Sequence, residues 1–242
     1  MKMERKEIKG NIIQITLEDE RWYAISENGE IKYIPSVTWI CEYYPKGIGF
    51  FKWLASKGWD EAEAIKIAAG EKGNTVHNAV EMLLKRETIS YNSEFINDDG
   101  IKREITADEY GAVLSFVDWW QDIKPEILGF NETVIAPDKS HAGTLDIRCK
   151  INNENWIIDI KTSADIWPSH ELQVNAYRMC GFVNYKMGIL QLGYKRNKKK
   201  KYKFTEILPQ EDLFSATKKI WGKETEGIFP LQREYPIEIK LS

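Results

Sequence analysis

The chain has 242 residues, 43% of them hydrophobic and 29% charged, with a formal net charge of −3 at pH 7. This is the composition of an ordinary globular protein, and no apolar stretch approaches the roughly 20 residues of a membrane-spanning helix. Three widely spaced cysteines without a CxxC pair exclude a zinc knuckle and cannot complete a four-cysteine iron–sulfur site.

The first ten residues, MKMERKEIKG, include acidic side chains and lack the apolar region of a signal peptide. We therefore expect a cytoplasmic protein with no membrane association. Its cysteines are expected to be reduced and structural: Cys41, Cys149 and Cys180.

The N-terminal part of the chain alternates between apolar and polar residues, which predicts strands over 11–17, 21–26 and 30–34. Asn28-Gly29 is a hairpin turn signal between the last two strands. An aromatic segment bounded by prolines, YIPSVTWICEYYPKG, follows at 33–47.

Two helices are predicted after this segment. The first covers about 60–86, and the glycines within Gly70–Gly73 could break it. The second covers 106–123, with Thr106 as its N-cap and Glu109 completing a capping box.

The pattern then changes to three successive strands separated by short polar turns, over 127–136, 142–151 and 155–162. A helix over 169–182, a hairpin of 186–195 and 201–208, and a last helix over 210–221 complete the chain. This order predicts an α/β fold whose central mixed sheet is flanked by helices, with an N-terminal β-hairpin and helical elaboration.

The segment WIIDIKTS, residues 156–163, places Asp159 and Lys161 within an otherwise apolar strand. Side chains two residues apart on a strand point to the same face, about 7 Å apart. Because buried charge is costly unless it is paired or binds a metal, either a structural ion pair or a functional site would explain this arrangement.

Asp146 lies on the preceding predicted strand, so it can approach Asp159 if the two strands pair as a meander. Two carboxylates and the Ile160 carbonyl would form the hard oxygen site that Mg²⁺ or Mn²⁺ prefers. Lys161 could then orient or help deprotonate a metal-bound water, or offset charge that builds on a phosphate.

Other polar side chains each allow two interpretations. Glu132 could supply a further carboxylate or be an exposed strand charge. Gln173 and Tyr177 share one helical face, so they could orient a phosphodiester and the lysine, or only pack. His77, four residues before Glu81 on a helix, could be a metal ligand or an ordinary packed histidine.

In their order along the chain, these residues resemble the RecB-like branch of the PD-(D/E)XK nucleases. The motifs are G-x-x-x-H (Gly73–His77), Glu132, G-x-x-D (Gly143–Asp146), D-x-K-T (Asp159–Thr162) and Q-x-x-x-Y (Gln173–Tyr177). The segment IPSVTWICEYYPKG is similar to an N-terminal P-S-V-T element of phage exonucleases and of the mitochondrial genome-maintenance exonuclease. The resemblance spans residues 34–195.

The resemblance implies a restriction-endonuclease-like core that hydrolyses DNA with Mg²⁺ or Mn²⁺ as cofactor. The implied metal ligands are His77, Asp146, Asp159 and the carbonyl of Ile160. The implied catalytic residues are Asp146, Asp159 and Lys161, supported by Glu132, Gln173 and Tyr177. The literal pair Pro137-Asp138 is set aside, because the RecB-like branch takes its aspartate from the G-x-x-D strand. No iron–sulfur cluster is expected.

We expect one nuclease domain over residues 1–242. A β-hairpin and the aromatic segment would occupy 1–57, the nuclease core 58–208, and a C-terminal helix and tail 209–242.

Two sequence features suit a path for DNA. The stretch YKRNKKKKYK, residues 194–203, has seven basic residues in ten positions and is either a phosphate contact or a solvated hairpin tip. The expected DNA contacts are Lys195, Arg196, Lys198 and Lys199 here, and Ser36 and Thr38 in the P-S-V-T segment. Aromatic residues could stack on unpaired bases or belong to the core: Trp39, Tyr43, Tyr44, Phe50, Phe51 and Trp53.

The expected function is therefore that of a DNA exonuclease acting on single strands or ends, in replication, recombination or repair, in a prokaryotic or phage-infected host. The alternatives are a flap or junction endonuclease of the same fold and a non-catalytic DNA-binding subunit. A helicase or recombination partner is suggested only by analogy with RecB-like fusions.

Overall fold

The computed structural model describes residues 4–9, 12–17, 20–27, 29–97, 100–230 and 240. Its centre is a five-stranded sheet in the order β11-β10-β9-β8-β7. The strands are β7 (Glu126–Ile135), β8 (Ala142–Ile151), β9 (Glu154–Lys161), β10 (Lys186–Leu192) and β11 (Tyr202–Ile207). β9 and β10 are parallel and the other neighbours are antiparallel, which confirms the predicted mixed sheet.

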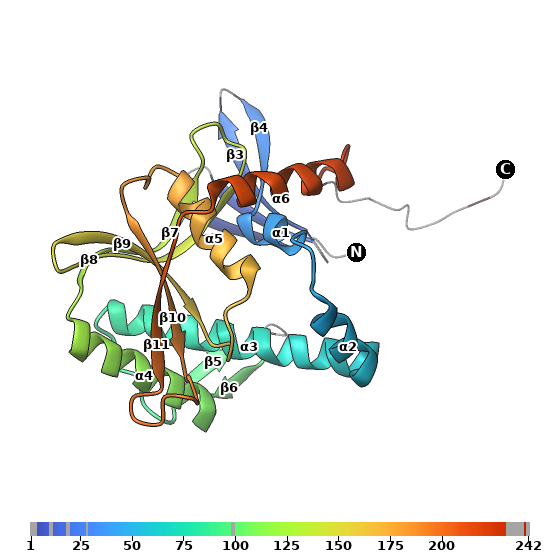
Figure 1. The fold of residues 1–242 in the computed structure, drawn as a ribbon. Coiled ribbons are helices and arrows are strands. Elements are labelled where there is room, and N and C mark those ends of the chain that lie inside the picture. Colours follow the sequence, from blue (N-terminus) through green and yellow to red (C-terminus); the bar gives the residue numbers. More distant parts are fainter. Residues whose placement is uncertain are drawn as a thin grey trace.

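Helices cover both faces of this sheet (Figure 1). α3 (Trp59–Leu84) and α4 (Ala107–Ile123) pack on one face, and α1 (Val37–Glu42), α5 (Pro168–Met179) and α6 (Glu211–Glu224) pack on the other. Ile158 contributes to the first core and Ile157 to the second. The nearly continuous apolar run of β9 follows from this double coverage, because its side chains point alternately into two dry layers.

Capping explains where α4 begins. Thr106 accepts a hydrogen bond from the Glu109 amide at 3.3 Å, and the Glu109 carboxylate accepts one from the Thr106 amide at 2.8 Å. The predicted capping box is confirmed. Arg103 also donates two hydrogen bonds to Glu109, at 2.9 and 2.6 Å, so the buried carboxylate is fully engaged.

The expected break in the first long helix is wrong, because α3 runs without interruption through Gly70 and Gly73 for 26 residues. Each glycine costs the helix about 1 kcal/mol relative to alanine. Burial of Val76, Ala79 and Val80 against the sheet offsets this cost. Tertiary packing thus outweighs local propensity here.

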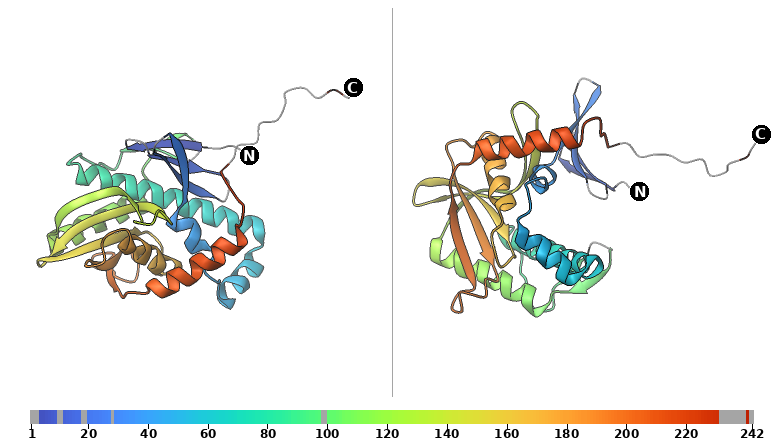
Figure 2. Two further views of the ribbon diagram at one scale, coloured as in Figure 1. Left: turned by 90° about the horizontal axis from the view of Figure 1, so that it is seen from above. Right: turned by 45° about the vertical axis from the view of Figure 1, so that its right-hand side comes forward.

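A second, four-stranded antiparallel sheet lies beside the central sheet, as the blue strands in Figure 2 show. It consists of β1 (Glu4–Lys9), β2 (Ile12–Thr16), β3 (Arg21–Glu27) and β4 (Glu30–Pro35). The three predicted strands are present, while β1 was not predicted. Glu27 pairs with Glu30, so the chain turns between them; Asn28 of the predicted turn lies outside the described residues.

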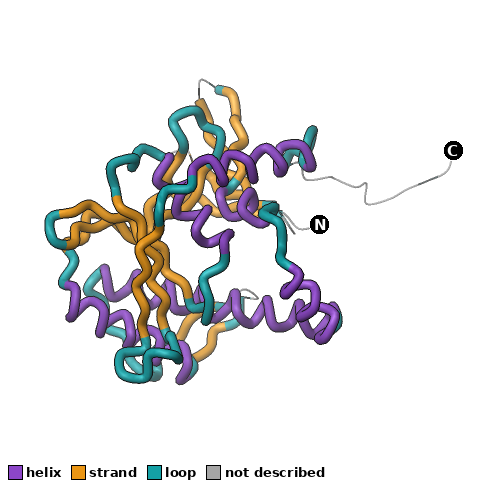
Figure 3. Tube along the Cα trace, viewed as in Figure 1, coloured by secondary structure: helices purple, strands orange, loops and turns teal. Residues whose placement is uncertain are grey.

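The remaining elements were not predicted from the sequence. They are α1, α2 (Ile48–Lys57), β5 (Glu94–Ile96) and β6 (Lys102–Glu104). Figure 3 shows these short helices and the small β5–β6 hairpin around the two larger sheets. Within the described ranges, no helix is both long enough and apolar enough to cross a membrane.

Candidate active site

The candidate site lies where β8 and β9 part. Backbone pairing between these strands ends at Ile147 and Ile158. Beyond this point the Asp146 carboxylate accepts a hydrogen bond from the Ile160 amide at 2.7 Å. A side chain therefore takes the place of a strand partner, which fixes Asp146 beside the end of β9.

Asp159 and Lys161 form an ion pair at this strand end, with 2.7 Å between Asp159 Oδ2 and Lys161 Nζ. The Asp159 side chain is 1% exposed and that of Lys161 is 18% exposed. Lys161 Nζ also donates to Gln173 Oε1 at 3.0 Å, and Gln173 Nε2 donates to the Tyr177 hydroxyl at 2.7 Å. Two residues of α5 thus hold the amine that β9 supplies.

Close packing of Tyr177 accounts for the glycine of the G-x-x-D motif. A Cβ atom on Gly143 would lie 2.5 Å from Cε1 of Tyr177, which is far inside normal carbon contact. Tyr177 is 1% exposed and belongs to the core between α5 and the sheet. Gly143 therefore leaves the room that positions the Tyr177–Gln173–Lys161 chain.

His77, from the C-terminal half of α3, completes the cluster. Its Nδ1 lies 3.3 Å from Asp146 Oδ1, and its Nε2 lies 3.0 Å from the Ile160 carbonyl oxygen. Both ring nitrogens therefore face acceptors, although a neutral imidazole has only one N–H to donate. An imidazolium, or a cation between the ring and the carbonyl, would satisfy this arrangement.

Burial and charge act in opposite directions on the ionisable groups of the site. Burial, together with the charge of Asp146, raises the pKa of Asp159 to about 6 although Lys161 lies beside it. Burial alone would raise the pKa of Asp146 as well, but His77 and Lys161 outweigh it and lower that pKa. Burial would lower the pKa of Lys161, and the two carboxylates reverse this and raise it. The pKa values of the carboxylates thus move apart, as in many catalytic pairs.

The carboxylate and carbonyl oxygens suit a hard divalent cation, whereas the imidazole nitrogen is a softer ligand. The 3.0 Å between His77 Nε2 and the Ile160 carbonyl oxygen equals the spacing of neighbouring ligands around an octahedral ion with bonds of about 2.1 Å, whereas Asp146 Oδ1 faces the other ring nitrogen, Nδ1. Across the described ranges, no three His, Cys, Asp or Glu side chains gather as a ready-made metal site. Asp159 instead faces Lys161.

A pocket of about 130 Å³ opens beside these donors. His77, Asp146 and Ile160 form one wall, and Lys6 of β1 and Asn131 of β7 contribute to the rest. His77, Asp146 and Ile160 are therefore reachable from solvent on the side of α3, and the N-terminal sheet contributes the ammonium group of Lys6 to this opening.

Glu132 does not join the cluster. Its two carboxylate oxygens accept hydrogen bonds from Arg148 Nε and Nη2, both at 2.9 Å. A cross-strand pair on β7 and β8 therefore occupies the carboxylate that was expected to support catalysis. Asp138 lies in the β7–β8 turn and accepts from the Ser140 amide, in keeping with its exclusion.

The residues expected to contact DNA fall into two groups. Ser36 is 1% exposed and its hydroxyl accepts from the Trp39 amide, so it caps α1 and is not accessible to DNA; Thr38 is partly exposed. The basic residues lie in the exposed β10–β11 loop, where Lys195 pairs with Asp108 and Arg196 pairs with Asp165. Lys198 and Lys199 are also exposed.

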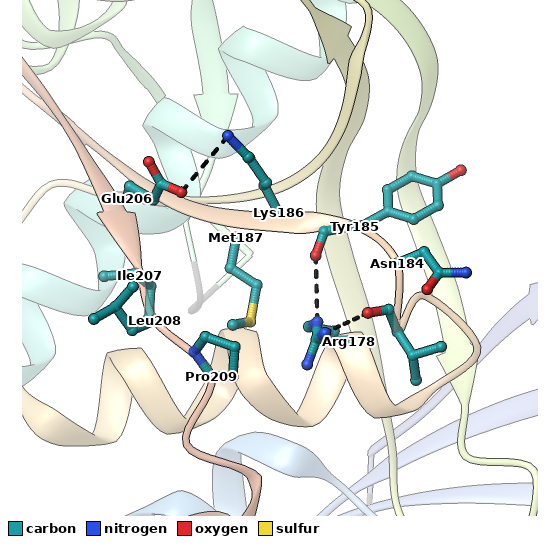
Figure 4. A pocket seen from close by; sticks show the side chains of 10 residues that line it. Arg178, Asn184, Tyr185, Lys186, Met187, Glu206, Ile207, Leu208 and Pro209 are labelled. Atoms are coloured by element: carbon teal, nitrogen blue, oxygen red, sulfur yellow. Dashed lines mark hydrogen bonds and ion pairs between the residues drawn. The ribbon is translucent and has the colours of Figure 1, made fainter.

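A second pocket, of about 280 Å³, lies between α5 and the β10–β11 hairpin. Figure 4 shows that Arg178 points to the Tyr185 carbonyl and that Lys186 pairs with Glu206. Arg178 also pairs with Glu211. The charged side chains that line this second pocket are engaged by other groups of the protein. The residues of the Asp146–Lys161 cluster lie elsewhere.

One link to the site could not be found by sequence reasoning. The Tyr23 hydroxyl lies 3.1 Å from Thr144 Oγ1, next to Gly143, and Gln14 donates to Tyr23 at 3.0 Å. This contact joins residues 121 positions apart. No local signal marks it, because it depends on how the N-terminal sheet docks on β8.

Comparisons with known proteins give limited information. No family model and no curated protein matches the chain. An alkaline exonuclease from Laribacter hongkongensis has a similar structure with a TM-score of 0.42 and 10% identity, covering 78% of this chain and 84% of that one. The structure of SSO0001 has a TM-score of 0.31 and 15% identity, covering 51% and 63% of the two chains. At these low scores neither likeness assigns a fold family or an activity to this chain.

Proposed function

We propose that this protein is a divalent-metal-dependent deoxyribonuclease with a restriction-endonuclease-like core. The observation that carries the proposal is the convergence of Asp146, Asp159 and Lys161 at the open end of β8 and β9, with Gln173 holding the amine. A purely structural ion pair would not require a second buried carboxylate and a histidine at the same place. Burial of so many charged groups is costly unless a cation and a substrate use them.

Lys161 acts on the phosphate that is cleaved. An ammonium has three N–H donors, and the contacts to Asp159 and Gln173 use two of them. The third can donate to a phosphoryl oxygen, where negative charge grows as water adds to phosphorus and the P–O bond to the leaving group breaks. Tyr177 and Gln173 fix this donor, so little reorganisation is needed during the reaction.

The residues that would hold the cation are Asp146, His77 and the carbonyl of Ile160. Asp159 would join them by exchanging part of its contact with Lys161. When bound, a divalent cation supplies Lewis-acid activation of the phosphoryl group and lowers the pKa of water. The chain's own part is to orient the donors and to exclude bulk water on the buried side of the site.

We further propose that the enzyme is an exonuclease on single strands or DNA ends, which rests on the RecB-like order of motifs. The test uses end-labelled linear DNA and circular single-stranded DNA, each with Mg²⁺, with Mn²⁺ and with EDTA. Degradation of linear but not circular DNA, only with metal, is the expected result. Cleavage of the circle would instead show an endonuclease, and no cleavage of either DNA in any metal would contradict the nuclease proposal.

A further inference from the structure

Helix α2 exposes its aromatic side chains to solvent. Phe51 is 53% exposed, Phe50 is 40% exposed and Trp53 is 36% exposed, and no residue of α2 is buried. Ring centroids lie 5.6 Å apart for Phe50 and Phe51, and 5.9 Å apart for Phe50 and Trp53. These three residues, the α2 aromatic face, form a contiguous aromatic surface, and such surfaces usually mark binding sites.

The same segment is positively charged. Residues 45–58 contain Lys46, Lys52 and Lys57 and no acidic residue. Lys57 pairs with Glu61 of α3, whereas neither Lys46 nor Lys52 is paired with a carboxylate within the described residues. Exposed rings alternating with lysines complement a ligand that is both aromatic and anionic, which is the chemistry of nucleic acid.

Lys46, at the start of this segment, acts on the same imidazole as Lys161 of the candidate active site. Burial and the charges of Lys161 and Lys46 together lower the pKa of His170, near the start of α5, to about 3, so both lysines lie within electrostatic range of one imidazole. Trp167, the N-cap of α5, is 56% exposed. α2 also packs on the N-terminal end of α3, the helix whose other half carries His77 (Figure 1).

We propose that the α2 aromatic face binds unpaired nucleobases by stacking, while Lys46 and Lys52 contact the adjoining phosphates. This inference rests on the proposed nuclease function and names its substrate as single-stranded nucleic acid. Bases in a duplex already stack on each other and hide their faces, so only an unpaired strand can use these rings. The lysines distinguish this ligand from an apolar protein surface, which has no anionic groups for them.

Binding in EDTA tests the inference without cleavage. The full chain is titrated into a fluorescein-labelled oligothymidylate and into a blunt duplex of equal length, and anisotropy gives the Kd. Phe51→Ala and Trp53→Ala should each weaken binding of the single strand by about 5- to 100-fold, since loss of one stacked base has an effect of this size. Lys52→Gln should reduce the slope of log K against log salt by about 0.7.

Two matched variants control the measurement. Phe51→Leu keeps an apolar side chain but removes the ring, so it should weaken the single-stranded complex nearly as much as alanine. Phe229→Ala removes an exposed aromatic beyond α6, 62% exposed, and should leave the Kd unchanged. Circular dichroism confirms that each variant is folded.

Three outcomes would overturn the inference. The α2 variants could bind the single strand as wild type does, they could lose duplex binding equally, or Phe51→Leu could bind as wild type. Binding to vesicles of anionic phospholipid and gel filtration are measured in parallel. If the α2 variants lose vesicle binding and not DNA binding, the α2 aromatic face belongs to a membrane contact. If they lose self-association and not DNA binding, it belongs to a contact with a second copy. Single-strand binding that depends on α2 in a protein that cleaves no DNA would support the inference while refuting the nuclease.

Discussion

Replacing Gly143 with alanine should destabilise the protein and slow DNA hydrolysis together. The new Cβ would lie 2.5 Å from Cε1 of Tyr177 and 3.4 Å from Cδ1 and Cζ. Carbon atoms in contact prefer about 3.5–4.0 Å, so the ring or the strand must move by roughly 1 Å. Tyr177 is enclosed in the core and cannot rotate into solvent. Overpacking of this kind costs about 1–3 kcal/mol.

The same displacement should reach the catalytic amine. Tyr177 accepts the hydrogen bond of Gln173, which holds Lys161, so a shift of the ring moves the donor that faces the phosphate. Misplacement of a reacting group by about 1 Å can slow a reaction about 100-fold. We therefore expect a lower kcat with a smaller change in KM, since bound substrate meets a misplaced amine.

Urea denaturation gives the loss of unfolding free energy, and cleavage of end-labelled DNA gives kcat and KM. Gly73→Ala is the matched control, because its Cβ would lie 3.8 Å from Thr162 Oγ1, an ordinary contact, within a helix. That variant should be more stable than wild type by up to about 1 kcal/mol. Wild-type stability and activity in Gly143→Ala would refute the proposal that Gly143 leaves the room that positions Tyr177.

Three further substitutions test other parts of the structure. Lys161→Ala should reduce kcat by at least about 100-fold if the amine stabilises charge in the transition state, and unchanged cleavage would end its catalytic assignment. Glu132→Gln should cost about 1 kcal/mol by weakening its bidentate pair with Arg148, with cleavage within a few-fold of wild type; a hundred-fold loss would return Glu132 to the site. Glu109→Gln should cost about 3 kcal/mol at neutral pH by breaking its buried pair with Arg103. Burial would raise the pKa of Glu109, but hydrogen bonds from Arg103 and Thr106 outweigh it and lower that pKa, so this stabilisation is present above the unfolded pKa near 4.3 and is lost as pH falls through the folded value. Urea titrations of both proteins should thus converge in acid, and a gap that persists or widens there would contradict the assignment.

Much of the central fold follows from local patterns. The three meander strands and the cap of α4 are encoded by apolar runs, turns and the pair Thr106–Glu109. The closeness of Asp159 and Lys161 follows from the two-residue period of β9 alone. Elements with weaker local signals were missed: β1 is highly charged, and the N-cap of α1, Ser36, directly follows Pro35 within the aromatic segment.

Contacts between residues far apart in the sequence limit how much of the site can be predicted from the sequence. Asp146 reaches β9 because the pairing of β8 with β9 ends at Ile147 and Ile158, one residue short of Asp146. No local pattern marks where this pairing ends. Glu132 is held by Arg148 of the neighbouring strand β8. This pair joins residues 16 positions apart on two strands, so sequence spacing alone could not place that carboxylate.

The most direct test of the central claim compares wild type with Asp146→Asn in DNA hydrolysis. The amide keeps the size of the carboxylate and can still accept from the Ile160 amide, so the fold should persist. With Mg²⁺, wild type should degrade linear DNA and Asp146→Asn should be slower by at least about 100-fold, because the amide lacks the negative charge that holds a divalent cation. Equal rates for the two proteins, or undiminished hydrolysis by wild type in EDTA, would contradict a metal-dependent centre at the parting of β8 and β9.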